Sequence, residues 1–205
     1  MGMGSIIDFR RARAARAGVA PSSDEALAGF VAGASLEVMP RTAAKIARFD
    51  AILPEGTTVY VAHIDGTPIE DMVATVRRLA DEGMKPMPHL PARSIADRAT
   101  FADWLGRYRA AAGIDRALIL GGGRSEPVGA FDRASQLLET GLLQEHGVTR
   151  VHIAGHPEGN RDIDADGGDR VAMEALLEKQ EWGAREGVEM AIATQFCFEA
   201  KPIVD

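Results

Sequence analysis

Short apolar runs alternate with amphipathic segments along most of this chain. The apolar runs fall at residues 35–39, 58–63, 85–90, 117–120, 150–154 and 190–198, and segments with helical spacing fall at 69–82, 96–112, 131–146 and 168–186. Most of the runs are continuously apolar, as strands covered on both faces are. The repeated alternation of strand and helix predicts an α/β protein with a parallel sheet joined by right-handed crossovers.

Glycines mark the expected ends of the helices. Residues 69–82 carry apolar side chains at spacings of three and four, which is the amphipathic helix pattern. Gly83, Gly113 and Gly147 lie just past three of the helical segments, where a left-handed cap conformation favours glycine.

The periodicity leaves two architectures open, a doubly wound open sheet and a (β/α)8 barrel. Six strands suit the open sheet, since a complete barrel typically has about 250 residues and this chain has 205. The glycine-rich motifs of the commonest nucleotide-binding open sheets are, however, not found. A barrel that lacks its last two βα units would give the same pattern.

The first residues differ in composition from the rest. Residues 9–20 hold four arginines and no acid, which superficially resembles an organelle transit peptide. We expect residues 1–33 to form an N-terminal arm and a leading helix, and residues 34–205 to form a barrel domain that is incomplete at its C-terminal end.

Composition narrows the range of functions. The formal net charge of −7 argues against nucleic acid as the main partner, because phosphate binding favours a basic surface. The single cysteine, Cys197, excludes a disulfide framework and a zinc site built from cysteines. No apolar run is long enough to span a membrane. We therefore expect a cytoplasmic protein with no membrane partner.

Candidate chemistry lies at the carboxyl ends of the expected strands, where parallel α/β proteins place their active sites. Glu37 stands inside the first apolar run, either as a satisfied structural acid or as a carboxyl whose pKa is raised for proton donation. Three histidines follow or end other strands, namely His63, His89 and His156. One such histidine is usually structural, but three favour a functional site.

Two further features follow the fourth and sixth strands. Gly121, Gly122 and Gly123 form a loop that would let a ligand approach the backbone closely, although a plain turn explains them equally well. Gln195 both donates and accepts hydrogen bonds, which suits the amide edge of a heterocycle.

Four segments together resemble the methylenetetrahydrofolate reductase family of flavin-dependent (β/α)8 barrels. They occur in the family's order, each on the expected strand: S-L-E-V-M-P at 35–40, P-H-L at 88–90, G-H-P-E-G at 155–159 and T-Q-F-C-F-E at 194–199. The resemblance spans residue 35 to the end. It implies a (β/α)8 barrel of the TIM type that apparently lacks the last two βα units.

The resemblance also implies roles for single residues. Glu37 would be the general acid that helps open the folate's imidazolidine ring to an iminium, and Gln195 would bind the pterin or the nicotinamide. FAD would be the cofactor, with NAD(P)H and 5,10-methylenetetrahydrofolate as substrates and a homo-oligomer as the expected assembly. The positions implied to contact FAD are Ala62, His63, His89, Gly121, Gly122, Gly123, Ala130, His156 and Lys179. No metal is implied.

Departures from the family pattern keep alternatives open. The family's fourth strand usually ends Arg-Gly-Asp, and here Gly121-Gly122-Gly123 lacks both the arginine and the acid; Ala62 stands where threonine is usual. A non-catalytic folate- or flavin-binding partner subunit is therefore the second hypothesis. A metal-dependent hydrolase barrel that uses the strand-end histidines is the third.

Overall fold

A computed structural model describes residues 23–31, 33–161, 163–164 and 169–204. Six parallel strands form one sheet: β1 (Leu36–Val38), β2 (Thr58–Val61), β3 (Lys85–Pro91), β4 (Arg116–Leu120), β5 (Arg150–Gly155) and β6 (Glu189–Thr194). The helices are α2 (Ser23–Val31), α3 (Pro40–Ala43), α4 (Ile69–Asp81), η1 (Ala92–Ser94), α5 (Arg98–Ala112), α6 (Ala134–Leu138), α7 (Leu142–Glu145), α8 (Arg170–Glu186) and α9 (Lys201–Val204). The predicted 1–33 arm lies largely outside the described residues.

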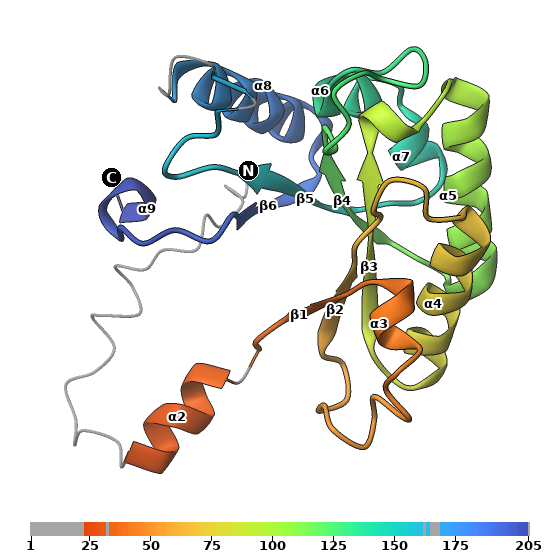
Figure 1. Ribbon diagram of the computed structural model, residues 1–205, viewed down its shortest axis with the longest axis vertical. Coiled ribbons are helices and arrows are strands. Elements are labelled where there is room, and N and C mark those ends of the chain that lie inside the picture. The colour runs from red at the N-terminus through yellow and green to blue at the C-terminus, as the bar shows by residue number, and fades with distance from the viewer. Residues whose placement is uncertain (1–22, 32, 162, 165–168, 205) are drawn as a thin grey trace.

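The prediction of a (β/α)8 barrel is wrong. The strands follow one another in sequence order from β1 to β6, and the sheet stays open because these two strands do not pair with each other. It curves as a half-barrel, with β1 and β6 as its two edges (Figure 1). Six strands with native twist and tilt do not complete the circle that eight strands close. The doubly wound alternative fails as well, since the strand order does not reverse.

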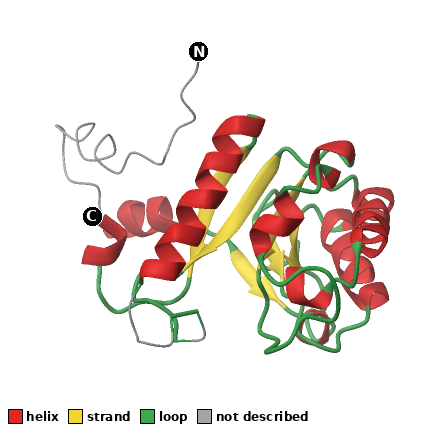
Figure 2. Cartoon of the chain, turned by 90° about the horizontal axis from the view of Figure 1, so that it is seen from above, coloured by secondary structure: helices red, strands yellow, loops and turns green. Residues whose placement is uncertain are grey.

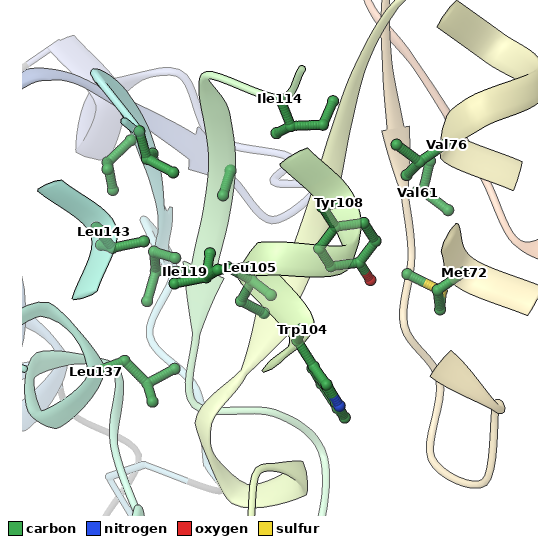
Figure 3. Packing of buried hydrophobic residues seen from close by; sticks show 14 of the residues in the cluster. Val61, Met72, Val76, Trp104, Leu105, Tyr108, Ile114, Ile119, Leu137 and Leu143 are labelled. Carbon is green, nitrogen blue, oxygen red and sulfur yellow. The ribbon is translucent and has the colours of Figure 1, made fainter. Parts of the chain in front are cut away.

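The helices that follow the strands cover the outer, convex face of the sheet (Figures 1 and 2). The hydrophobic core lies between that face and the helices. Figure 3 shows Val61 of β2 beside Met72 and Val76 of α4, and Ile119 of β4 near Leu105 of α5. All five side chains are buried.

Among the described residues, the concave face has no helical layer like that on the convex face, so the expectation that the strands are covered on both faces holds only in part (Figures 1 and 2). In β3 every residue after Lys85 is buried, whereas β5 alternates between half-buried and buried positions. The edge strand β6 has no buried residue. Its Ile192 is 52% exposed, and the phenylalanines that follow, Phe196 and Phe198, are also exposed.

Most predicted elements are confirmed, with one exception. The segment 131–146 forms two short helices, α6 and α7, instead of one. Gly141 adopts a φ of 74° between them, a left-handed conformation that interrupts a right-handed helix and that glycine adopts at no steric cost. The glycine caps are confirmed, with Gly113 ending α5 at a φ of 60°.

Candidate functional site on the concave face

The strand register places four polar side chains on the concave face. Glu37 of β1 pairs with Tyr60 of β2, and Leu118 of β4 pairs with both His89 of β3 and His152 of β5. Residues paired in register on parallel strands point to the same face of the sheet. The same strands turn Val59, Ile119 and other apolar neighbours toward the helices. The concave face therefore gathers a carboxylate, a phenol and two imidazoles.

Tyr60 and His152 form a hydrogen bond across the sheet. Oη of Tyr60 lies 2.6 Å from Nδ1 of His152, and the ring centroids are 5.8 Å apart. Burial raises the pKa of Tyr60, and burial, aided by Arg150, lowers the pKa of His152. Both groups are consequently neutral near pH 7. The hydroxyl donates to Nδ1 when the His152 hydrogen is on Nε2, and Nδ1 donates to the hydroxyl oxygen in the other tautomer.

Glu37 lies against His89. Nε2 of His89 is 3.3 Å from Oε2 of Glu37, but the atoms are not aligned for a hydrogen bond, so among the described residues Nε2 has no hydrogen-bond partner. Burial, and to a smaller extent His63, lowers the pKa of His89 to about 4. His89 is thus a neutral imidazole that can accept or donate one hydrogen bond at this site. The Glu37 side chain is 59% exposed, so the apolar enclosure predicted from its strand is not found.

A pocket of about 360 Å³ lies at this cluster. Its lining joins the two edges of the open sheet: Ser35, Leu36 and Glu37 with Tyr60 and Leu118 on one side, and Ile192, Ala193 and Thr194 on the other. Gln195 follows directly, with its amide N–H bonded to the carbonyl of Gly155 at 2.9 Å and its side chain exposed. The structure therefore brings Glu37 and Gln195 to the same region of the concave face.

Lys179 and His156 form a second group at the carboxyl end of β5. Lys179 of α8 is 9% exposed, and its Nζ lies 3.5 Å from the carbonyl oxygen of Ala154. Burial lowers the pKa of the lysine. Burial and then the lysine's charge lower the pKa of His156. A buried ammonium with one long carbonyl contact is suited to receive an anion, since an anion would compensate its lost hydration.

Two predicted residues near β2 do not join the pocket. His63 stacks on Trp104 of α5, with ring centroids 4.9 Å apart, and its Nε2 lies 3.1 Å from the carbonyl oxygen of Thr67. Burial lowers its pKa. Ala62 is 4% exposed and donates its amide N–H to Val38 at 2.8 Å. Among the described residues, Nδ1 of His63 has no hydrogen-bond partner.

The glycine loop, residues 121–123, follows β4 and therefore lies at the carboxyl-terminal edge of the parallel sheet. The carbonyl oxygen of Gly121 accepts a hydrogen bond from the backbone N–H of Arg93 at 2.9 Å. Gly122 has a φ of 95°, and a Cβ added there would be crowded, since it would lie 3.0 Å from the Cβ of Pro91. A Cβ added at Gly123 would meet nothing within 4 Å. The next residue, Arg124, forms an ion pair with Asp65. Gly122 is therefore explained by packing, while Gly121 and Gly123 leave open space.

Ala130 is exposed in the loop between β4 and α6. Its amide N–H bonds to the carbonyl of Ala96 at 2.8 Å. The same carbonyl would lie 1.9 Å from a Cβ at Gly129, so only glycine fits there.

Sequence reasoning missed Tyr60 and His152. A signal was present, because polar and apolar residues alternate in Thr58–Val61 and again from Arg150 to Ile153. Such alternation is typical of strands with one open face. Because these runs were interpreted as strands covered on both faces, no functional role was expected for either residue.

No protein-family model matches this chain. Within the described residues, no helix is long and apolar enough to cross a membrane. In the same part of the chain, no three histidine, cysteine or carboxylate side chains gather where they could hold a metal ion.

Proposed function

We propose that the protein is a flavin-dependent reductase that transfers a hydride from NAD(P)H, through bound FAD, to 5,10-methylenetetrahydrofolate. The observation that carries this proposal is the contact between Glu37 and neutral His89 on the concave face, at 3.3 Å. These two residues come from separate motifs of the resemblance, S-L-E-V-M-P and P-H-L, and they meet in the folded chain. The third motif residue, Gln195, follows the strand that completes the pocket lining.

Side chains of this chain fit the proposed cofactor at two places. The buried ammonium of Lys179, whose Nζ lies 3.5 Å from the carbonyl oxygen of Ala154, suits a phosphate group of FAD. The orphaned Nε2 of His89 suits a polar edge of the flavin ring. The open space at Gly121 and Gly123 would admit a flat ring close to the backbone. When bound, FAD supplies the hydride chemistry that no amino-acid side chain provides.

Glu37 is the proposed general acid. A carboxyl that donates its proton to an amine nitrogen of the folate weakens the adjacent carbon–nitrogen bond, and the imidazolidine ring opens to an iminium. Gln195 would orient the pterin through its paired donor and acceptor.

The half-reactions test this proposal. In the wild-type protein loaded with FAD, anaerobic NAD(P)H should bleach the flavin absorption, and methylenetetrahydrofolate should restore it. Glu37→Gln removes the transferable proton and keeps the shape, so flavin reduction should survive while folate reduction slows by about 10²- to 10⁴-fold. Glu145→Gln is a matched control, since its carboxyl is 60% exposed on α7 and Glu37 is 59% exposed.

The opposite outcomes are equally clear. If Glu37→Gln slows both half-reactions equally, the carboxylate is structural and the proposal of a general acid fails. If the wild-type protein binds FAD or folate but never exchanges a hydride, the chain is a non-catalytic binding subunit, as the missing acid at Gly123 would explain.

A further inference from the structure

We infer that Tyr60 and His152 form a strut across the concave face, which sets how far apart the two edges of the half-barrel lie. The two side chains are hydrogen-bonded, with Tyr60 Oη 2.6 Å from His152 Nδ1. Tyr60 belongs to β2 and His152 to β5, so the bond passes over β3 and β4. Both are positioning residues, since they act through the strands that carry them.

The two ends of the strut would lie far apart in a flat sheet. From β2 to β5 there are three strand spacings, which amount to about 14 Å across a flat sheet. The pairing register adds an offset along the strands. Tyr60 is level with Met87 of β3, whereas His152 is level, through Leu118, with His89. The offset between these two levels is two residues of β3, or about 7 Å.

The bond therefore requires a curved sheet. Side chains of a flat sheet stand perpendicular to it and do not converge. The ring centroids of Tyr60 and His152 are nevertheless only 5.8 Å apart. The curvature of the half-barrel (Figure 1) brings the inner ends of the two side chains together. Breaking the bond removes a contact that only the curved sheet can make.

The surroundings of the strut support it. Tyr60 and His152 are both half-buried, so water competes less for their hydrogen bond than it would at an open surface. The ring of His89, from β3, lies edge-on to Tyr60 with the centroids 6.2 Å apart. The phenol is thus held from the side as well as at its hydroxyl.

The strands that carry the strut are the neighbours of the two edge strands. β1 pairs with β2, and β6 pairs with β5. Residues of both edges, among them Glu37 and Thr194, line the same pocket as Tyr60. Since β1 and β6 do not pair with each other, no backbone ladder fixes the distance across this opening. The strut therefore sets the width of the pocket.

The consequence for ligand binding rests on the proposed function, in which Glu37 and Gln195 act on one folate from opposite edges. A wider opening would leave the folate in contact with only one of them. The proposed FAD contacts, such as His89 of β3 and the loop after β4, lie between the two ends of the strut. Loss of the strut should accordingly affect folate more than FAD.

The distance across the opening tests the strut without folate or FAD. Spin labels on the native Cys197, just past β6, and on Arg41→Cys, an exposed position of α3 next to β1, report this distance by pulsed electron spin resonance. Tyr60→Phe keeps the ring and removes the hydroxyl. The mean label distance should then lengthen by up to about 5 Å, one strand spacing, and its distribution should broaden.

Tyr108→Phe is the matched control for this measurement. Tyr108 is the only other tyrosine, and its buried hydroxyl has no hydrogen-bond partner among the described residues, so the label distance should stay at the wild-type value.

A second variant guards against an effect of Tyr60→Phe on folding. His152→Phe removes the other partner and should give the same lengthening. The double variant with both changes should lengthen the distance no further than either single change, because both remove one interaction. Circular dichroism identifies the variants that are folded. An unchanged label distance in a folded single variant overturns the strut.

Binding measurements separate the strut from the proposed function. Tyr60→Phe should weaken the binding of 5-methyltetrahydrofolate to the FAD-loaded protein by about 10-fold, the effect of about one hydrogen bond, and leave FAD affinity nearly unchanged. Equal losses of both affinities would mean that Tyr60 supports the fold as a whole, and would overturn its positioning role. If the wild-type protein binds neither FAD nor folate, the proposed function fails, while the label distances still decide the strut.

Discussion

The two faces of the sheet differ in what their side chains do. On the convex face, strand residues such as Val61 and Ile119 are fully buried under the helices. On the concave face, β2 presents Tyr60 and β5 presents His152, and the pocket lies open between β1 and β6. The convex face supplies the apolar burial that stabilises the fold. The concave face holds the polar and ionisable side chains.

This division follows from strand geometry, because successive side chains of a strand point to opposite faces of the half-barrel sheet. Each strand has to bury one set of side chains, and the helices on the convex face do so. The other set is free of that requirement, since no second layer covers it. Polar groups are tolerated there because they pair with one another, as Tyr60 does with His152 at 2.6 Å.

The largest expected effect comes from removing apolar volume in the core, compared with the same substitution in the exposed edge strand. Ile119→Ala, at a position that is 0% exposed, should lower the free energy of unfolding by about 2–5 kcal/mol, because a cavity remains in the core. Ile192→Ala is the matched substitution at a residue that is 52% exposed in the edge strand. It should cost less than about 1 kcal/mol. Urea unfolding of both variants measures the difference, and equal losses would contradict the assignment of the core.

A smaller effect should appear as a pH dependence of stability. His89 has its pKa lowered from 6.5 to about 4 by burial, so the unfolded chain binds its proton more tightly than the folded one. The stabilisation is complete above pH 6.5 and is lost as the pH falls toward 4, by up to about 3 kcal/mol. His63, His152 and His156 shift in the same direction.

The His89→Gln variant isolates the share of this one residue. Its unfolding free energy should decline less between pH 6.5 and 4 than that of the wild type. If His89→Gln followed the wild-type curve instead, burial of a neutral His89 would be refuted.

The smallest stability effect is expected at Lys179, where it should be opposite in sign. Lys179→Met replaces a buried ammonium with an apolar side chain of similar length, so the free energy of unfolding should rise by about 1 kcal/mol. FAD affinity should fall at the same time, by about 10-fold, if the ammonium meets a phosphate. Thermal unfolding and fluorescence titration of FAD measure the two effects. A destabilised variant with unchanged FAD affinity would show that Lys179 is structural.

The sequence predicted the strands and most helices because their signals are local. Apolar spacing defines α4 and α5, and Gly113 ends α5 where a left-handed cap is required. The break at Gly141 was missed, because the apolar period continues on both sides of that glycine. The assignment to the (β/α)8 barrel class was wrong, because no local pattern along the chain reports how many strands a sheet holds or whether its edge strands pair.

The sequence predicted only those pocket residues that lie in the motifs of the resemblance. Glu37 and His89 were expected together and meet at 3.3 Å. His63 was grouped with them by its place in the chain, yet its ring stacks on Trp104 instead. Tyr60 and His152 are 92 residues apart, so their hydrogen bond depends on the register of four strands. No spacing in the sequence reports such a contact.

The central claim, that ligands bind on the concave face, is tested most directly by mapping the response to folate residue by residue. Leu118 and Ile119 are adjacent in β4, and only Leu118 lines the pocket. When 5-methyltetrahydrofolate is added to the FAD-loaded protein, methyl NMR signals of Leu118 and Ala193 should shift, and those of Ile119 and Leu143 should stay within line width. Shifts confined to the helix-covered side, or no shift at a saturating concentration, would contradict the account.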